Sequence, residues 1–286
     1  MGEPQPSFDL VADVQQLLQY HFMQNALLAG TLVAAVAGVV GYFVVLRGQT
    51  FAAHTLSQVG FPGAAGAALL GLPQLAGLLA LCVASSLGIA GLGRSDGSRA
   101  GEPAAIGAVQ AFALALGFLF VGLYKGFLTG INGLLFGTFV GVSDAQVVQL
   151  AFVAVVALGV LVVIGRPLLL LSIDPDLAAA RGVPVRALSV LFLVFLGLSV
   201  ASVTLVTGAL LVFSLLVTPA AAAQELTARP PLAILLGVVL ALVVTWLSLS
   251  VAYFTVFPIG FFVTTFGFAT YLLARGVRWA REGRVR

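Results

Sequence analysis

Charge is the scarcest property of this 286-residue sequence, of which only 8% is Asp, Glu, Lys or Arg. Soluble domains typically carry about 25% charged residues, so this chain cannot cover a surface that faces water. Hydrophobic residues make up 61% of the sequence. Its 33 glycines suit a membrane bundle, in which small residues let helix backbones approach closely. The composition predicts an all-α, polytopic membrane protein.

Cysteine, histidine and lysine are nearly absent. Cys82 is the only cysteine, which excludes a disulfide within one chain. Two histidines, His21 and His54, are too few for a multi-ligand zinc cage. The single lysine, Lys125, does not stand in the glycine-rich motif of P-loop proteins, so the chain is not expected to bind ATP. We expect no tightly bound cofactor and no catalytic residue.

Acidic residues are absent from the interior of the apolar runs, although Asp144 and Glu225 stand at the ends of two of them. Proton- and sodium-coupled carriers usually need a carboxylate at membrane depth, so this absence disfavours a secondary carrier. An intramembrane enzyme is disfavoured too, because no span carries paired carboxylates or a Ser–His pair with an orienting group. The basic residues stand singly between apolar runs or in a short tail, which is typical of membrane orientation rather than of nucleic-acid binding.

Apolar segments long enough to cross a membrane, about 20 residues each, recur along the whole chain. We predict nine spanning helices, at residues 23–46, 51–71, 74–93, 104–124, 145–165, 187–206, 208–224, 232–256 and 259–275. They form a permease domain over residues 23–275, preceded by an interfacial segment (1–22) and followed by a basic cytoplasmic tail (276–286).

The basic residues support this count. If Arg47 lies inside, alternation of nine spans places every basic residue except Lys125 on the cytoplasmic side. The N-terminus is then outside and the C-terminus inside. The glycine-rich segment from Lys125 to Asp144 would form a short external helix.

The longest internal loop, 166–186, contains a complete short-helix pattern. Asp174 is a good N-cap, Pro175 suits the first helical position and Asp176 complements the helix dipole. Ala179 and its alanine neighbours propagate the helix, and Gly182 can end it in a left-handed conformation. Two turns are not stable alone in water, so this helix must dock, either on the membrane interface or on a cytoplasmic ATPase.

The segment Asp174 to Pro184 (Asp-Pro-Asp-Leu-Ala-Ala-Ala-Arg-Gly-Val-Pro) resembles the coupling loop of permeases of the bacterial zinc and manganese ABC importer family. Three further stretches resemble that family in the expected order. These are the second-span signature from Phe51 to Gly63, which ends in Pro62 and Gly63, the late-span run around Pro219, and the stretch from Tyr253 to Gly260 with Pro258 and Gly260.

The resemblance implies a homodimeric permease in the bacterial cytoplasmic membrane, with the pathway between the two copies. Its partners would be a cytoplasmic ABC ATPase dimer, which alone binds ATP, and an extracytoplasmic metal-binding protein. The ATPase would contact Asp174, Pro175, Asp176, Ala179, Arg181 and Gly182. Lys125 and Asn132 are candidates for contact with the binding protein. Pro62, Gly63, Pro219, Pro258 and Gly260 would be structural.

His54 and Gln58 are four residues apart and therefore share one face of a helix. In the family that this chain resembles, the matching positions are typically aspartate and histidine, which contact the metal, so this sequence departs from the pattern at both. The alternative is that both side chains only join helices through hydrogen bonds. We expect His54 to face the two-fold axis as a transient metal contact, with zinc as the cargo, because imidazole suits zinc and no carboxylate remains to favour manganese.

Three alternatives remain open from the sequence. Manganese is the second candidate for the metal. The same architecture also serves permeases for metal chelates such as siderophores or cobalamin, which usually have more spans. A channel or secondary carrier that works without partners is the alternative from a different class.

Overall fold

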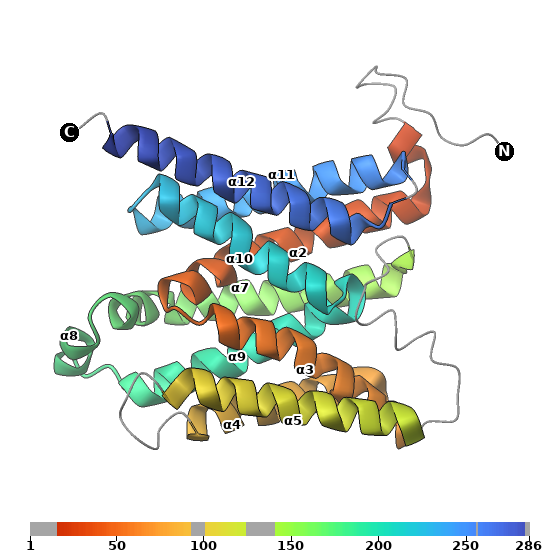
Figure 1. Cartoon of the computed structure of the whole chain (residues 1–286), viewed down its shortest axis with the longest axis horizontal. Helices are drawn as coiled ribbons and strands as arrows, with labels where there is room; N and C mark the ends of the chain where they lie inside the picture. Colours follow the sequence, from red (N-terminus) through yellow and green to blue (C-terminus); the bar gives the residue numbers. More distant parts are fainter. Residues whose placement is uncertain (1–15, 93–100, 124–140, 256, 284–286) are drawn as a thin grey trace. The chain divides into compact units, whose positions relative to one another are not determined.

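The computed structural model describes residues 16–92, 101–123, 141–255 and 257–283 of the chain (Figure 1). These residues form helices and connecting turns, without a strand in the described ranges. The helices are α2 (His21–Leu46), α3 (Thr50–Leu69), α4 (Gln74–Leu92), α5 (Gly101–Leu123), α7 (Asp144–Ile173), α8 (Pro175–Ala180), α9 (Val185–Thr207), α10 (Ala209–Leu226), α11 (Pro230–Tyr253) and α12 (Ile259–Glu282). The all-α prediction is confirmed.

The helices divide into two compact units. The first contains α2 up to Tyr42, the start of α7, α10 from Ser214, and all of α11 and α12. The second contains α3, α4, α5, α8 and α9 together with the end of α2, the remainder of α7 and the start of α10. Three helices, α2, α7 and α10, therefore contribute residues to both units.

Glycine allows α3 and α4 to pack closely in the second unit. A Cβ atom built on Gly63 would lie 2.5 Å from the carbonyl oxygen of Gly77, and Gly77 approaches the Gly63 carbonyl in return. Beside this contact, Leu78 and Cys82 of α4 are fully buried with Val59 of α3. Small residues at a membrane helix contact give this kind of backbone approach.

A glycine also allows close helix packing in the first unit. Gly41 of α2 lies directly against the carbonyl oxygen of Leu216 in α10. Two hydrogen bonds also join helices here. The Gln224 side chain donates to the carbonyl of Tyr42 at 2.9 Å, and the Trp246 indole donates to the Thr31 hydroxyl at 3.0 Å.

Seven helices within the described ranges are long and apolar enough to span a membrane: α2, α4, α5, α7, α9, α11 and α12. Large apolar side chains on them remain exposed, among them Val162 at 81% and Phe118 at 71%. Exposed apolar faces of this size suit lipid and not water. The other two predicted spans correspond to α3, which is glycine-rich and carries His54 and Gln58, and to the shorter α10. The nine-span count and the orientation remain predictions.

Two predicted boundaries are wrong. Helix α7 does not end at residue 165 but continues through Arg166 and Pro167 to Ile173, so the loop begins eight residues later. Pro167 does not stop the helix, because membrane helices tolerate proline where local adjustments satisfy the freed carbonyl. Helix α12 likewise continues past residue 275 to Glu282, so most of the predicted tail is helical.

Candidate functional site

Helix α3 places His54 and Gln58 side by side. Their side chains are in contact, with Gln58 Nε2 3.1 Å from His54 Nε2, and both are half-buried. An interval of four residues advances a helix by about 6 Å along its axis, so the two side chains extend toward each other over one turn. The prediction that both residues lie on one face of a helix is confirmed.

Helix α5 extends this pair into a chain of hydrogen bonds. Gln110 Nε2 donates to Gln58 Oε1 at 2.8 Å, and the Thr55 hydroxyl donates to Gln110 Oε1 at 3.0 Å. Gln110 therefore joins α5 to α3 through two contacts. No local sequence pattern connects Gln110 to His54, because the two residues lie on different helices.

One nitrogen of the His54 ring, Nε2, takes part in these hydrogen bonds, and the other, Nδ1, does not. Because the Gln58 amide nitrogen donates to Nε2, the ring proton belongs on Nδ1 in this arrangement. Among the residues that the structure describes, His54 Nδ1 is the one buried side-chain nitrogen or oxygen without a hydrogen-bond partner. The ring also lies 4.6 Å, centroid to centroid, from the Phe213 ring in an edge-to-face contact. A buried polar atom without a partner is costly and indicates a role other than stability.

Pro62 adds a second acceptor near the pair. It lies inside α3 and has no N–H group, so the backbone carbonyl of Gln58, four residues earlier, loses its usual donor within the helix. A carbonyl oxygen released in this way is a typical transient ligand for cations in membrane helices.

The groups around His54 that could contact a cation are few. No group of three or more His, Cys, Asp and Glu side chains comes together within the described ranges. One imidazole, amide groups and a freed carbonyl give few ligands per chain, and an ion held so weakly can leave again.

Helix α8 has the cap geometry that the sequence predicts. Asp174 is extended, and its carboxylate accepts a hydrogen bond from the Leu177 backbone N–H at 2.9 Å. Pro175 occupies the first turn, and Asp176 follows it. At the other end Gly182 has φ = 78°, and the Val183 N–H bonds the Ala178 carbonyl at 3.0 Å. Both ends of this six-residue helix are therefore closed by specific contacts.

The buried face of α8 is narrow. Ala178 is fully buried and packs toward the α9 side, whereas Ala179 and Arg181 are exposed. The exposed side chains leave most of the surface of α8 open to a partner.

Arg47, at the junction of α2 and α3, contacts both helices that flank α8. Its guanidinium donates to the Ser189 hydroxyl of α9 at 3.0 Å and to the Ser172 hydroxyl of α7 at 3.5 Å. It also lies 5.4 Å from the centroid of the buried Phe192 ring, a cation–π contact. Arg47 therefore joins the α2–α3 junction to the two helices, α7 and α9, that precede and follow α8.

The remaining predicted residues are scattered. Pro219 lies inside α10, and Pro258 is the N-cap of α12, with Gly260 in its first turn. Lys125 and Asn132, predicted to contact a binding protein, lie outside the described residues, as does most of the predicted 1–22 segment.

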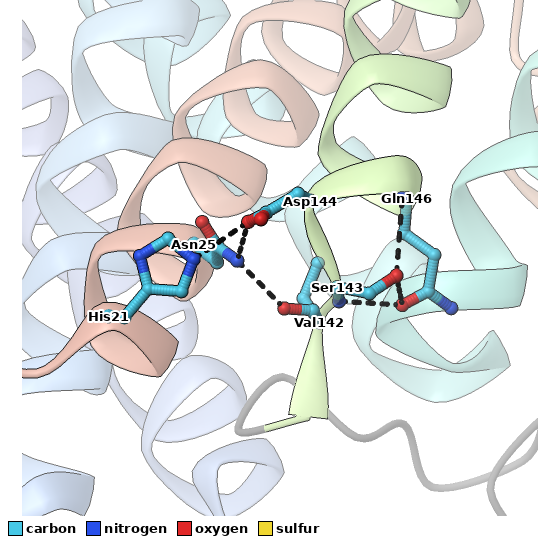
Figure 2. Close-up of polar contacts among 6 residues, drawn as sticks. All are labelled: His21, Asn25, Val142, Ser143, Asp144 and Gln146. Atoms are coloured by element: carbon cyan, nitrogen blue, oxygen red, sulfur yellow. Dashed lines mark hydrogen bonds and ion pairs between the residues drawn. The ribbon is translucent and has the colours of Figure 1, made fainter.

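A second polar cluster joins the start of α2 to the start of α7 (Figure 2). His21 Nε2 donates to Asp144 Oδ1 at 2.9 Å, and Asn25 Nδ2 donates to the same oxygen at 2.6 Å and to the Val142 carbonyl at 3.2 Å. The sequence places Asp144 at the end of an apolar run, but no local pattern pairs it with His21.

The chain is thus a bundle of apolar helices with a polar cluster on a proline-containing helix, α3, and a short capped helix, α8, between two long helices. Comparison with known proteins identifies the family. The model of the ABC 3 transport family matches residues 19–277, and the chain belongs to this family. It is thus a multi-pass protein of the bacterial cytoplasmic membrane.

Two relatives and one solved structure illustrate the similarity. The manganese transport system membrane protein MntC of Halalkalibacterium halodurans is 33% identical over 231 residues, 79% of this chain and 78% of the relative. The manganese import system permease protein ScaB of Streptococcus parasanguinis is 34% identical over 210 residues, 73% of this chain and 74% of the relative. The structure of PsaBC from Streptococcus pneumoniae in complex with Fab matches with a TM-score of 0.82 and 27% identity, over 93% of this chain and 95% of that chain.

Proposed function

We propose that this chain is the membrane permease of an ABC importer that carries divalent zinc into the cytoplasm. Two copies would form the pathway, a separate ATPase dimer would supply the energy, and an external binding protein would deliver the metal. The observation that carries the proposal is the His54 cluster. It offers an imidazole nitrogen without a partner in a transport permease whose relatives are named for a divalent metal.

His54 is the proposed contact for the metal, and Gln58 is proposed to orient it. Histidine ligands usually donate their second N–H to an acceptor. If the Gln58 amide turns over, its oxygen accepts a hydrogen bond from His54 Nε2–H, and the lone pair of Nδ1 becomes free for the metal. Gln110 and Thr55 can follow this reversal, because an amide can turn and a hydroxyl can donate or accept.

Zinc is the proposed cargo because the donors near His54 are imidazole and amide groups. Carboxylate and water oxygens favour manganese, whereas imidazole suits zinc, and the His54 contacts include no carboxylate. The names of MntC and ScaB favour manganese as the second candidate. Uptake measured in proteoliposomes with zinc and manganese, separately and in competition, decides between them.

Helix α8 is the proposed contact with the ATPase. Its capped ends and its exposed Arg181 suit a rigid element that docks into a partner. The purified permease without the ATPase should transport no metal. Transport by the permease alone would favour a secondary carrier, and transport of a chelate but not of free ions would favour a chelate permease.

The decisive experiment is zinc uptake by the His54→Ala variant in the reconstituted complex. We expect uptake to fall at least about tenfold, as for the loss of a metal contact, while ATP hydrolysis continues. Ser57→Ala is the matched control, because Ser57 lies on the same helix and bonds only the His54 backbone carbonyl. Full uptake by His54→Ala would contradict the proposal.

A further inference from the structure

His21 and Asp144 bring an imidazole and a carboxylate together at the end of α2 and α7 that the basic-residue pattern places outside (Figure 2). We infer that these two side chains form a second, weak binding site for a divalent metal ion, which receives the ion on the external side. This inference rests on the proposed import function.

The spacing of the donor atoms suits a shared ion. His21 Nε2 and Asp144 Oδ1 are 2.9 Å apart. Two ligand atoms about 2.1 Å from one ion are roughly 3.0–3.4 Å apart in octahedral or tetrahedral geometry. An opening of about half an ångström, and loss of the proton between the two groups, would admit the ion without a change in the backbone.

The carboxylate is held in place by buried contacts. Asn25, which is 6% exposed, donates to Asp144 Oδ1 at 2.6 Å and to the Val142 carbonyl at 3.2 Å. Gln146 Oε1 accepts from the Ser143 backbone N–H at 2.9 Å, which closes the start of α7. Asn25 thus positions the proposed ligand from α2, and the backbone on either side of Asp144 is fixed.

The pair is open to solvent and contributes little to stability. Its side chains are 72% and 73% exposed, and exposed ion pairs contribute little to stability. Asp144 is also the only carboxylate of the described chain that the predicted orientation places outside, and His21 is one of two histidines in the whole sequence. The imidazole and the carboxylate therefore meet in one place, although they come from residues more than a hundred positions apart in the sequence.

Two protein donors with water in the remaining positions give a weak site. This is what a receiving site requires, because an ion bound by three or four protein ligands would not be released into the pathway. The class of ligand is a divalent transition-metal ion, zinc or manganese, that accepts mixed imidazole and carboxylate ligands.

The test compares His21→Ala, His21→Gln and Asp144→Asn with wild type in the reconstituted complex, with zinc alone as the probe. We expect each variant to raise the half-saturating external zinc concentration at least about tenfold and to affect the maximal rate less. The His21→Gln variant is decisive, because its amide can still donate to Asp144 but cannot replace imidazole as a zinc ligand. Gln24→Ala, which alters an exposed neighbour on α2 that bonds only the Leu18 carbonyl, is the matched control.

Zinc binding measured by equilibrium dialysis of the complex in a His54→Ala background gives a second readout. Loss of bound zinc on adding His21→Ala would support the site. Unchanged zinc binding, or a His21→Gln variant that behaves as wild type while His21→Ala is defective, would overturn it and leave only a structural contact. If the wild type imports no divalent metal at all, the proposed function fails. If the His21 and Asp144 variants take up zinc normally while His54→Ala is defective, the outer site alone is rejected.

Discussion

At the scale of single residues, the central polar cluster has a direction. Thr55 donates to Gln110, Gln110 donates to Gln58, and Gln58 donates to His54. Each member donates to the next, so the orientation of the Gln58 amide at the His54 ring depends on Gln110, a residue of a different helix. Gln110 is therefore a positioning residue in the proposed mechanism, although it need not contact the metal.

Replacement of Gln110 tests this dependence. Gln110→Leu should reduce zinc uptake about tenfold, as expected for loss of an outer-shell partner, while the folded complex loses only about 0.6–1.7 kcal/mol of stability from the interhelical bonds. Uptake and the thermal stability of the complex are the two measurements. Gln110→Glu, which keeps an acceptor for Thr55 but adds a charge, should also be defective. A Gln110→Leu variant with normal uptake would separate Gln110 from the function of His54.

At the scale of elements, α8 was predictable and the contact between the N-terminal ends of α2 and α7 was not. The limits of α8 follow from Asp174, Pro175 and Gly182, which act on their own neighbours in the chain. The bond between His21 and Asp144 joins residues far apart in sequence and depends on packing that no local pattern contains. The end of α7 was misplaced because Arg166 and Pro167 resemble a stop signal, although the helix continues.

Loss of the Asp174 cap should uncouple the importer. Asp174→Ala removes the acceptor of the Leu177 N–H, which costs α8 about 1 kcal/mol and should lower zinc uptake per ATP hydrolysed. Asp174→Asn should be close to wild type, because asparagine is an equally good N-cap. Measuring uptake and hydrolysis in the same vesicles gives this ratio. Equal ratios for Asp174→Ala and Asp174→Asn would show that the cap has no role in coupling.

The contact between α3 and α4 predicts a difference between two glycines. Gly63→Ala should destabilise the complex by about 1–3 kcal/mol, as overpacking does, because the new Cβ would lie 2.5 Å from the Gly77 carbonyl oxygen. Gly91→Ala, in α4 itself but with no atom within 4 Å of the new Cβ, should be neutral. Thermal unfolding of the detergent-solubilised complex measures both. Equal melting temperatures for the two variants would contradict the proposed packing.

At the scale of the whole molecule, composition was sufficient to predict a helical membrane protein, and family membership agrees with it. The scarcity of charge and the long apolar runs dictate that outcome, since every backbone polar group in lipid must be satisfied inside its own helix. The orientation depends on a weaker signal, the distribution of single arginines. The His54 cluster was partly predictable, because the spacing from His54 to Gln58 is local, whereas Gln110 lies on another helix.

The orientation can be tested with two reporters. A fluorescent protein fused after Arg286 should fold and fluoresce, because the C-terminal end is predicted to lie in the cytoplasm. Alkaline phosphatase, which is active only outside the cytoplasmic membrane, should be active when fused after Leu123 and inactive when fused after Gly182. The opposite pattern of phosphatase activity would place α8 outside and would contradict its proposed contact with the ATPase.

Cys82 offers a practical advantage for watching this protein work. It is the only thiol of the sequence, it is fully buried, and its sulfur faces the Leu56 carbonyl. Water-soluble maleimide probes should therefore leave the native chain unlabelled. A cysteine introduced at the exposed Gln24 would be the sole reactive attachment point for a spin label or a fluorophore, so the start of α2 can be followed without first removing a native residue.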